Sequence, residues 1–299
     1  MTLTAHPGFA LDPVAEATGP FCTEDFLTVV SRYDDGEGIP ASTSDAFIPL
    51  RRLDDVVMFA GDSDVTDYHT PLGDGTEALM ASVAADVAPG RFVLDSLPEE
   101  AAKPLAAGLT DAGWDVTSRV HQVAAVLHLP GTVDEYLTSI GKKERHEVRR
   151  KRRRYERMVG EVRHEVSTGT GKISDEFVRL HRLAEGAKGR FMTESRRALF
   201  ADLAGLDGWR FDWLATGDGA AAIVFGYADD SGYYLYNSGY DPEHSDASPG
   251  VVLLAIMIEA AISEGRSRFD FLKGDETYKF RLGAQRRPLV EIVAVEPGA

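Results

Sequence analysis

The chain has 299 residues, of which 43% are hydrophobic and 27% charged, and its formal net charge is −16. This composition predicts a packed protein with one large domain or two of ordinary size. The acidic balance argues against a general nucleic-acid-binding protein, and no apolar run reaches the roughly 20 residues that span a bilayer.

The N-terminal segment and the cysteine content lead us to expect a cytoplasmic protein without a membrane partner. The first 20 residues contain no basic segment followed by an apolar core, so they do not resemble a secretion signal. Cys22 is the only cysteine and cannot form an internal disulfide, which fits a reducing compartment. Because residues 1–20 lack periodicity, we expect them to form a loose arm.

Residues 21–130 are predicted to form an N-terminal domain that mixes strands and helices. Short apolar runs between turn signals predict strands at 46–50, 56–60, 92–97 and 123–129. Longer periodic segments predict helices at 75–88 and 99–112.

Residues 131–299 are predicted to form a second domain that opens with a basic helix. This helix is expected to run from Asp134 to about Val159, with Thr132 as its N-cap and Gly160 at its end. Its central part reads KKERHEVRRKRRRYER and carries ten Lys and Arg residues against three Glu residues.

The remaining elements of the second domain are helices first and strands later. Helices are predicted at 175–185 and 194–204, the latter with Thr193 as its N-cap. Strands are predicted at 211–216, 221–228, 233–240, 268–272 and 289–295, with a short helix at 276–281. The connection from the strand at 233–240 to the strand at 268–272 should be right-handed, with the two strands parallel.

An almost wholly apolar helix lies within that connection. It begins at Ser248-Pro249-Gly250, ends at Gly265, and must be buried on most sides. Its first turn offers unpaired backbone N–H groups and a glycine that permits close approach, which suits a phosphate. The alternative is that Ser248 is only an N-cap and Pro249 only the first helical residue.

The segments YNSGYDPEHSDASPG and FDFLKGDETYKFRLG, in this order after the basic helix, resemble the GNAT acyltransferase fold. More narrowly, the chain resembles CelD-type acetyltransferases, which are related to FemAB peptidyltransferases, over about residues 132–283. The resemblance implies an α/β fold (α+β mixed sheet) of tandem GNAT-like halves. It also implies acetyl-CoA or another acyl-CoA as donor in the C-terminal half. A small-molecule amine acceptor would lie between the halves, and in the FemAB branch the donor is instead aminoacyl-tRNA.

The resemblance also indicates where the donor binds. The pyrophosphate of CoA would lie on the amides at the start of the apolar helix, and the pantetheine arm on the backbone that ends the strand at 233–240. Plain sheet pairing is the alternative for that strand end. The predicted cofactor-binding residues are Tyr236, Asn237, Ser238, Ser248, Pro249, Gly250, Val251 and Val252.

Four polar residues after the strand at 268–272 are the catalytic candidates, namely Asp275, Glu276, Tyr278 and Lys279. Acyl transfer needs a proton acceptor, an oxyanion stabiliser and an acid for the leaving thiolate. Asp275 or Glu276 could accept the proton, Tyr278 could be the acid, and Lys279 could stabilise the oxyanion. The alternatives are an N-cap at Asp275 with Glu276 in the first turn, and packing or surface roles for Tyr278 and Lys279.

The acceptor-binding candidates are Asp67, Tyr68, His69 and Arg149. The first three lie in a polar loop. The resemblance implies that this loop faces the active site, and the alternative is that it is a surface turn. Three interpretations of the basic helix stay open: a solvated helix, a site for the CoA 3′-phosphate or an anionic substrate, and a site for a tRNA acceptor end. No histidine has metal-ligand spacing, so no metal is predicted.

Overall fold

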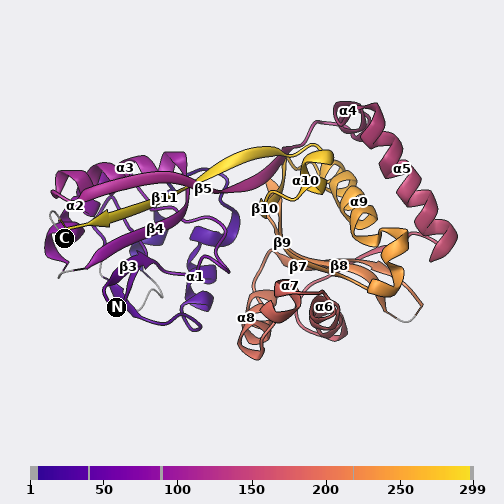
Figure 1. Cartoon of the computed structure of the whole chain (residues 1–299), viewed down its shortest axis with the longest axis horizontal. Coiled ribbons are helices and arrows are strands. Elements are labelled where there is room, and N and C mark those ends of the chain that lie inside the picture. The colour runs from indigo at the N-terminus through magenta and orange to yellow at the C-terminus, as the bar shows by residue number, and fades with distance from the viewer. Residues whose placement is uncertain (1–5, 40, 88–89, 218, 297–299) are drawn as a thin grey trace. The chain divides into compact units, whose positions relative to one another are not determined.

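The chain folds into two compact units in the computed structural model, which describes residues 6–39, 41–87, 90–217 and 219–296 (Figure 1). The first unit comprises residues 1–124 and 287–299, and the second comprises residues 125–286. The second domain was predicted to extend to residue 299, whereas residues after Arg286 group with the first unit. The predicted helix end at Ala88 lies outside the described residues.

The first unit contains a mixed sheet with helices packed on it. Its helical segments are the 3-10 turns η1 (Pro7–Ala10) and η2 (Gly19–Cys22) and the helices α1 (Glu24–Val30), α2 (Thr76–Asp86) and α3 (Glu99–Asp111). Its strands are β1 (Glu37–Ile39), β2 (Leu50–Leu53), β3 (Val56–Phe59), β4 (Arg91–Pro98) and most of β5 (Asp115–His128) and β11 (Gln285–Val295). The β3–β4 pair is parallel and the β4–β11 pair antiparallel. This antiparallel pairing is the physical reason why the C-terminal strand belongs to the first unit.

Residues 6–20 pack within the first unit, so the prediction of a loose arm is wrong for this segment. Pro13 forms an isolated β-bridge with Leu72. Ala15 is fully buried and its amide donates a hydrogen bond to Thr70 Oγ1 at 3.0 Å. Scattered contacts of this kind fix the segment without giving its sequence a helical or strand period.

The second unit has helices on both faces of its sheet. Its helical segments are α4 (Val133–Ser139), α5 (Gly141–Met158), α6 (Lys172–Arg182), α7 (Ala187–Phe191), α8 (Glu194–Ala204), η3 (Pro242–Ala247), α9 (Pro249–Ser263) and α10 (Thr277–Arg281). Its strands follow the order β10 (Arg268–Lys273), β9 (Gly232–Tyr240), β8 (Ala220–Ala228), β7 (Trp209–Ala215) and β6 (His164–Ser167). The β9–β10 pair is parallel, as predicted, and the β6–β7, β7–β8 and β8–β9 pairs are antiparallel.

Helix α9 is the buried helix that the sequence predicts. Leu253 and Ile258 are fully buried, and they share a hydrophobic core with Leu235 of β9 and Phe269 of β10. Helices α5 and α9 lie on one face of the β7–β9 sheet, and α6, α7 and α8 lie on the other (Figure 1). Burial on both faces explains why β8 reads as a continuous apolar run.

The basic helix is divided, which corrects the prediction of one helix from Asp134 to Val159. Helix α4 has the predicted cap, because Thr132 and Glu135 form a reciprocal capping box. Gly141 then adopts a left-handed φ of +74°, and α5 starts anew from this residue. An αL conformation interrupts the α-helical backbone, and glycine adopts it at little cost.

Several other elements were misplaced or missed. The predicted strand at 46–50 is wrong in position, because β2 begins at Leu50 and Phe47 instead makes isolated bridges to Ser42 and Leu72. The short elements α1, β6 and α7 were not predicted. Helix α8, in contrast, has the predicted bounds, and Thr193 Oγ1 accepts a hydrogen bond from the Arg196 amide.

Candidate functional site

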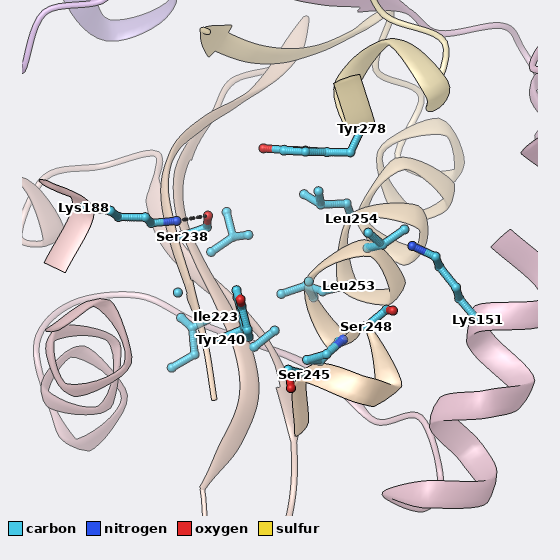
Figure 2. Close-up of a pocket in the computed structure, with 16 residues that line it drawn as sticks. Lys151, Lys188, Ile223, Ser238, Tyr240, Ser245, Ser248, Leu253, Leu254 and Tyr278 are labelled. Carbon is cyan, nitrogen blue, oxygen red and sulfur yellow. Dashed lines mark hydrogen bonds between the residues drawn. The ribbon is translucent and has the colours of Figure 1, made fainter. Parts of the chain in front are cut away.

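A pocket of about 310 Å³ lies within the second unit, between the first turns of α9 and the end of β9 (Figure 2). Strand β8 forms part of its wall, and side chains from α5, α7 and α10 complete it. Five predicted site residues line it, namely Ser238, Ser248, Pro249, Gly250 and Val251, together with the predicted catalytic residue Tyr278. The tertiary structure thus joins segments that lie far apart in the sequence, from Lys151 to Tyr278.

The pocket exists because β9 leaves its parallel neighbour. Pairing between β9 and β10 ends at Tyr234 opposite Asp270. On its other edge, β9 contains a bulge, because Phe225 pairs with Asn237 while Gly226 pairs with Leu235. A bulge bends a strand and increases its twist. The last residues of β9 therefore diverge from β10 and face the pocket.

The pantetheine candidates on β9 point in different directions. The ring of Tyr236 packs against Phe200 and Trp209, so this side chain belongs to an aromatic cluster and does not line the pocket. The side-chain oxygen of Asn237 accepts a hydrogen bond from the Ser238 amide. Among these three residues only Ser238 lines the pocket.

The first turn of α9 is open on its outer side. A Cβ atom added to Gly250 would meet no atom within 4 Å, so another molecule can approach this backbone. Ser248 occupies the N-cap position of α9 and Pro249 is its first helical residue, but Ser248 has a left-handed conformation with φ of +55° and its side chain makes no capping hydrogen bond. The first backbone amides of any α-helix have no carbonyl group one turn before them to accept their hydrogen bond. The first amides of α9 therefore lack a partner within the helix.

Val252 differs from its neighbours. It is buried, and its amide already donates to the Ser248 carbonyl at 3.2 Å. Its predicted role as an amide donor to a ligand is therefore not compatible with this geometry, and Gly250 and Val251 are the residues suited to it.

Lys151 brings a positive charge to this end of the pocket. It extends from α5, and its amine lies beside the first turns of α9 (Figure 2). A cation next to a helix N-terminus reinforces the preference of that terminus for an anion. The sequence predicts a basic helix but does not identify Lys151 as the residue that reaches the pocket.

Arg149, the predicted acceptor-binding residue of the same helix, lies elsewhere. It lines a second hollow of about 700 Å³ at the beginning of α5, with Lys142, Lys143, Arg145 and Arg281 among its neighbours. Two carboxylates, Glu144 and Glu147, also line this hollow, so its positive charge is partly compensated.

Tyr278 occupies the opposite end of the first pocket from Ser245 and Ser248 (Figure 2). Burial raises the pKa of the Tyr278 phenol, and the negative charge of Glu276 raises it further. The phenol therefore keeps its proton at neutral pH and can donate a hydrogen bond.

Lys279 lies in a cage of oxygen atoms and does not line the pocket. Its Nζ atom lies 2.6 Å from the Lys273 carbonyl, 3.4 Å from the Gly274 carbonyl and 3.0 Å from a Glu276 carboxylate oxygen. The residue is 3% exposed. These contacts hold the end of β10 and favour the packing alternative for Lys279 over contact with substrate.

The other two catalytic candidates also lie outside the pocket lining. Asp275 is exposed, and the N-cap of α10 is Glu276, whose side chain makes no capping bond, so the predicted N-cap at Asp275 is wrong. Asp270, which needs a partner inside the sheet, accepts a hydrogen bond from the Leu272 amide at 2.8 Å.

Lys188 of α7 is a pocket residue that the sequence did not reveal. Its Nζ atom lies 3.4 Å from Ser238 Oγ and faces the pocket (Figure 2). The five-residue helix α7 shows no hydrophobic period, so the sequence marks this segment only by the nearby glycines Gly186 and Gly189.

The loop predicted to contact the acceptor is largely buried within the first unit. Tyr68 is 0% exposed and His69 is 5% exposed, so neither faces solvent, which corrects both the substrate-binding and the surface-turn interpretations. The His69 ring contacts the Asp95 carbonyl at 2.9 Å and the Gly61 carbonyl at 3.1 Å. Asp67 is half-buried. Polar side chains that pair with backbone carbonyls can be buried, and the sequence alone does not reveal those partners.

Neither a metal site nor a membrane span occurs in the described part of the chain. No group of three or more His, Cys, Asp or Glu residues there could hold a metal ion. Within the same residues, no helix has the length and apolar character needed to cross a membrane.

Comparisons with known proteins concern the domain and the fold. Residues 142–280 match the family model described as acetyltransferase (GNAT) domain. A protein of unknown function from Bacteroides thetaiotaomicron VPI-5482 has a similar structure, with a TM-score of 0.66, 13% identity, and coverage of 97% of this chain and 95% of the other. FemX follows with a TM-score of 0.59, 10% identity, and coverage of 97% and 94%.

L-PGS from Bacillus licheniformis is also similar, with a TM-score of 0.57, 15% identity, and coverage of 91% of this chain and 88% of the other. At these identities the likeness concerns the fold alone. No curated protein sequence matches the chain.

Proposed function

We propose that this chain, which has a GNAT acetyltransferase domain at residues 142–280, transfers an acetyl or other acyl group from acyl-CoA to an amine of a small molecule. The match of residues 142–280 to this domain supports an acyltransferase. The identity of the donor, the acceptor class, the closer relation to CelD-type enzymes and the cytoplasmic location are parts of the proposal.

One observation carries the assignment of the donor. A single pocket connects the open first turn of α9, the diverging end of β9 and the phenol of Tyr278. An elongated carrier with phosphates at one end and a thioester at the other fits such a pocket, because its two ends need different chemical surroundings. The phosphate end needs amides and a cation, and the thioester end needs a proton donor.

The residues of the pocket can be assigned on this basis. The amides of Gly250 and Val251, with the Lys151 ammonium, would hold the pyrophosphate. The backbone around Ser238 would accompany the pantetheine arm. Acyl-CoA supplies an acyl group activated as a thioester, and Tyr278 would provide the proton that the departing thiolate needs.

A thermal-unfolding experiment tests the donor. A ligand that binds only the native state raises the unfolding temperature, so acetyl-CoA should raise it in a concentration-dependent manner. Dephospho-CoA and free adenine serve as comparison ligands that separate the contributions of the phosphates. Absence of any shift at millimolar acetyl-CoA would contradict the assignment.

A second candidate function is aminoacyl-tRNA-dependent peptidyl transfer, as in the FemAB branch. The hollow at the beginning of α5 favours it, because Lys142, Lys143, Arg145 and Arg149 form a basic surface outside the first pocket. Such a surface could bind a phosphate backbone. The two candidates differ in their donor, so acetyl-CoA binding and tRNA binding distinguish them.

A further inference from the structure

Lys188 is a lysine amine in the wall of the pocket where the proposed function places the thioester. Its amine lies beside Ser238 on the β9 side of the pocket, across from Lys151 on the α9 side, while Tyr278 and Ser248 lie at opposite ends (Figure 2). Helix α7 carries Lys188 toward β9, and the contact of 3.4 Å between Nζ and Ser238 Oγ directs the amine to the pocket wall.

The surroundings of this amine favour its neutral form. Although the residue as a whole is exposed, removal of water around the ammonium group is the largest effect, and it lowers the pKa of Lys188. Glu276 opposes this change, and the positive charge of Lys279 lowers the pKa further. His181 of α6 is another titratable neighbour, and its own pKa is lowered by burial and by Lys188. A larger fraction of Lys188 is therefore neutral, which is the form that attacks acyl groups.

We propose that Lys188 is a self-acylation site: it accepts the acyl group from the thioester bound in its own pocket when no external amine is present. This inference rests on the proposed function, because it requires acyl-CoA in the pocket. It adds an acceptor that belongs to the protein itself.

The chemistry of the step is balanced. The lone pair of neutral Lys188 Nζ forms a bond to the acyl carbon, and the bond between that carbon and sulfur breaks. The nitrogen loses one proton to solvent, and the departing thiolate gains one from the Tyr278 phenol on the pocket wall, which regains its proton from solvent. The products are an amide at Lys188 and free CoA, with no oxidation or reduction.

Acylation has a structural consequence for the pocket. The amide of acyl-lysine is uncharged and bulkier than the amine, and it would remain in the pocket that a second thioester must occupy. The modified protein should therefore bind acetyl-CoA more weakly than the unmodified protein, so the modification would limit activity when acceptor is scarce.

The experiment uses the full chain and acetyl-CoA without added amine. Mass spectrometry of the intact protein counts acetyl groups over time, and peptide mapping locates them. Lys103 serves as the internal reference, because it is an exposed lysine of α3 in the first unit, paired with Glu99. We expect acetylation of Lys188 to saturate with acetyl-CoA and to exceed that of Lys103 by about tenfold or more, because binding positions the thioester next to the amine.

Two variants sharpen the test. Lys188→Arg should abolish the fast modification while the acetyl-CoA-induced thermal shift persists, and Lys103→Arg should leave the fast modification unchanged. If acetyl-CoA raises the unfolding temperature but Lys188 reacts no faster than Lys103, self-acylation is wrong and the proposed function stands. If acetyl-CoA produces no thermal shift, the donor assignment fails and self-acylation fails with it.

Discussion

Lys151 is the residue through which α5 contributes to the pocket, and its removal should weaken donor binding. We expect Lys151→Met to raise the Kd for acetyl-CoA by about tenfold, because one charge-assisted hydrogen bond to a phosphate is removed. Isothermal titration calorimetry measures the change. Lys143→Met is the matched control, since Lys143 lies on the same helix but lines the second hollow. Equal effects of the two substitutions would show that general charge, and not position, determines binding.

Lys279 illustrates how a candidate catalytic group can be structural. In Lys279→Met, the Lys273 and Gly274 carbonyls and the Glu276 carboxylate lose their ammonium partner. We expect the free energy of unfolding to fall by about 1.5–3 kcal/mol, the usual range for hydrogen bonds to a charged group. Urea denaturation measures it, with the exposed Asp275→Asn as control. A variant of unchanged stability would contradict the packing role.

His181 should make stability depend on pH. Burial, with a further contribution from Lys188, lowers the pKa of His181 from its ordinary value of 6.5 to about 4, although a hydrogen bond with Asn237 opposes the change. The unfolded chain therefore binds a proton at this residue before the folded chain does. The free energy of unfolding should fall as pH decreases from 6.5 to 4, by at most about 3 kcal/mol for this residue.

The comparison that isolates this effect is His181→Leu. Urea unfolding of both proteins at pH 7 and at pH 5 gives two pH dependences, and that of the variant should be smaller. Other groups that titrate in this interval act equally in both proteins and cancel in the difference. If the two dependences coincide, the native protein does not hold His181 in its neutral form.

At the scale of the element, helix α9 combines a buried body with an open beginning. We expect Gly250→Val to weaken acetyl-CoA binding while leaving the unfolding temperature nearly unchanged, because the added side chain meets no protein atom at Cβ but occupies the space of approach. The matched control is Gly171→Val, which also adds a side chain into open space immediately before a helix, outside this pocket. Unaltered acetyl-CoA binding by Gly250→Val would count against a phosphate at this turn.

Helix α5 is the element that distinguishes the two candidate functions. Arg149 and Arg153 are exposed, whereas Arg150 is held by two hydrogen bonds to Glu147. If the chain uses tRNA, the change of both Arg149 and Arg153 to Glu should lower tRNA affinity. The change should also reduce the salt dependence of log K by about 0.9 for each phosphate that the variant no longer neutralises. Filter binding at several salt concentrations measures both, with Lys103→Glu as control.

The acyl-CoA function predicts a different pattern for the same variant. The first pocket does not include Arg149 or Arg153, so acetyl-CoA binding should persist when both are changed to Glu. Intact tRNA affinity in this variant would exclude α5 as the tRNA-binding element.

At the scale of the molecule, the division into units depends on strand pairing that local sequence does not encode. The pattern of apolar residues predicts the final strand, β11. Its antiparallel pairing with β4, which this pattern does not reveal, places it in the first unit and not in the second. The same limitation applies to residues 6–20, whose contacts with distant residues such as Thr70 hold them in place. Pairing partners far apart in sequence leave no periodic signal near either residue.

The sequence by itself determined the elements whose signals are local. Apolar periodicity, turn residues and caps predict α8, α9 and the parallel β9–β10 pair, because each depends on neighbours within a few residues or on the handedness of one connection. Only the tertiary structure decided which polar groups share the pocket. It turned Lys151 and Lys188 toward the pocket, enclosed Lys279 among carbonyls and buried His69, because side-chain direction and burial depend on packing between distant segments.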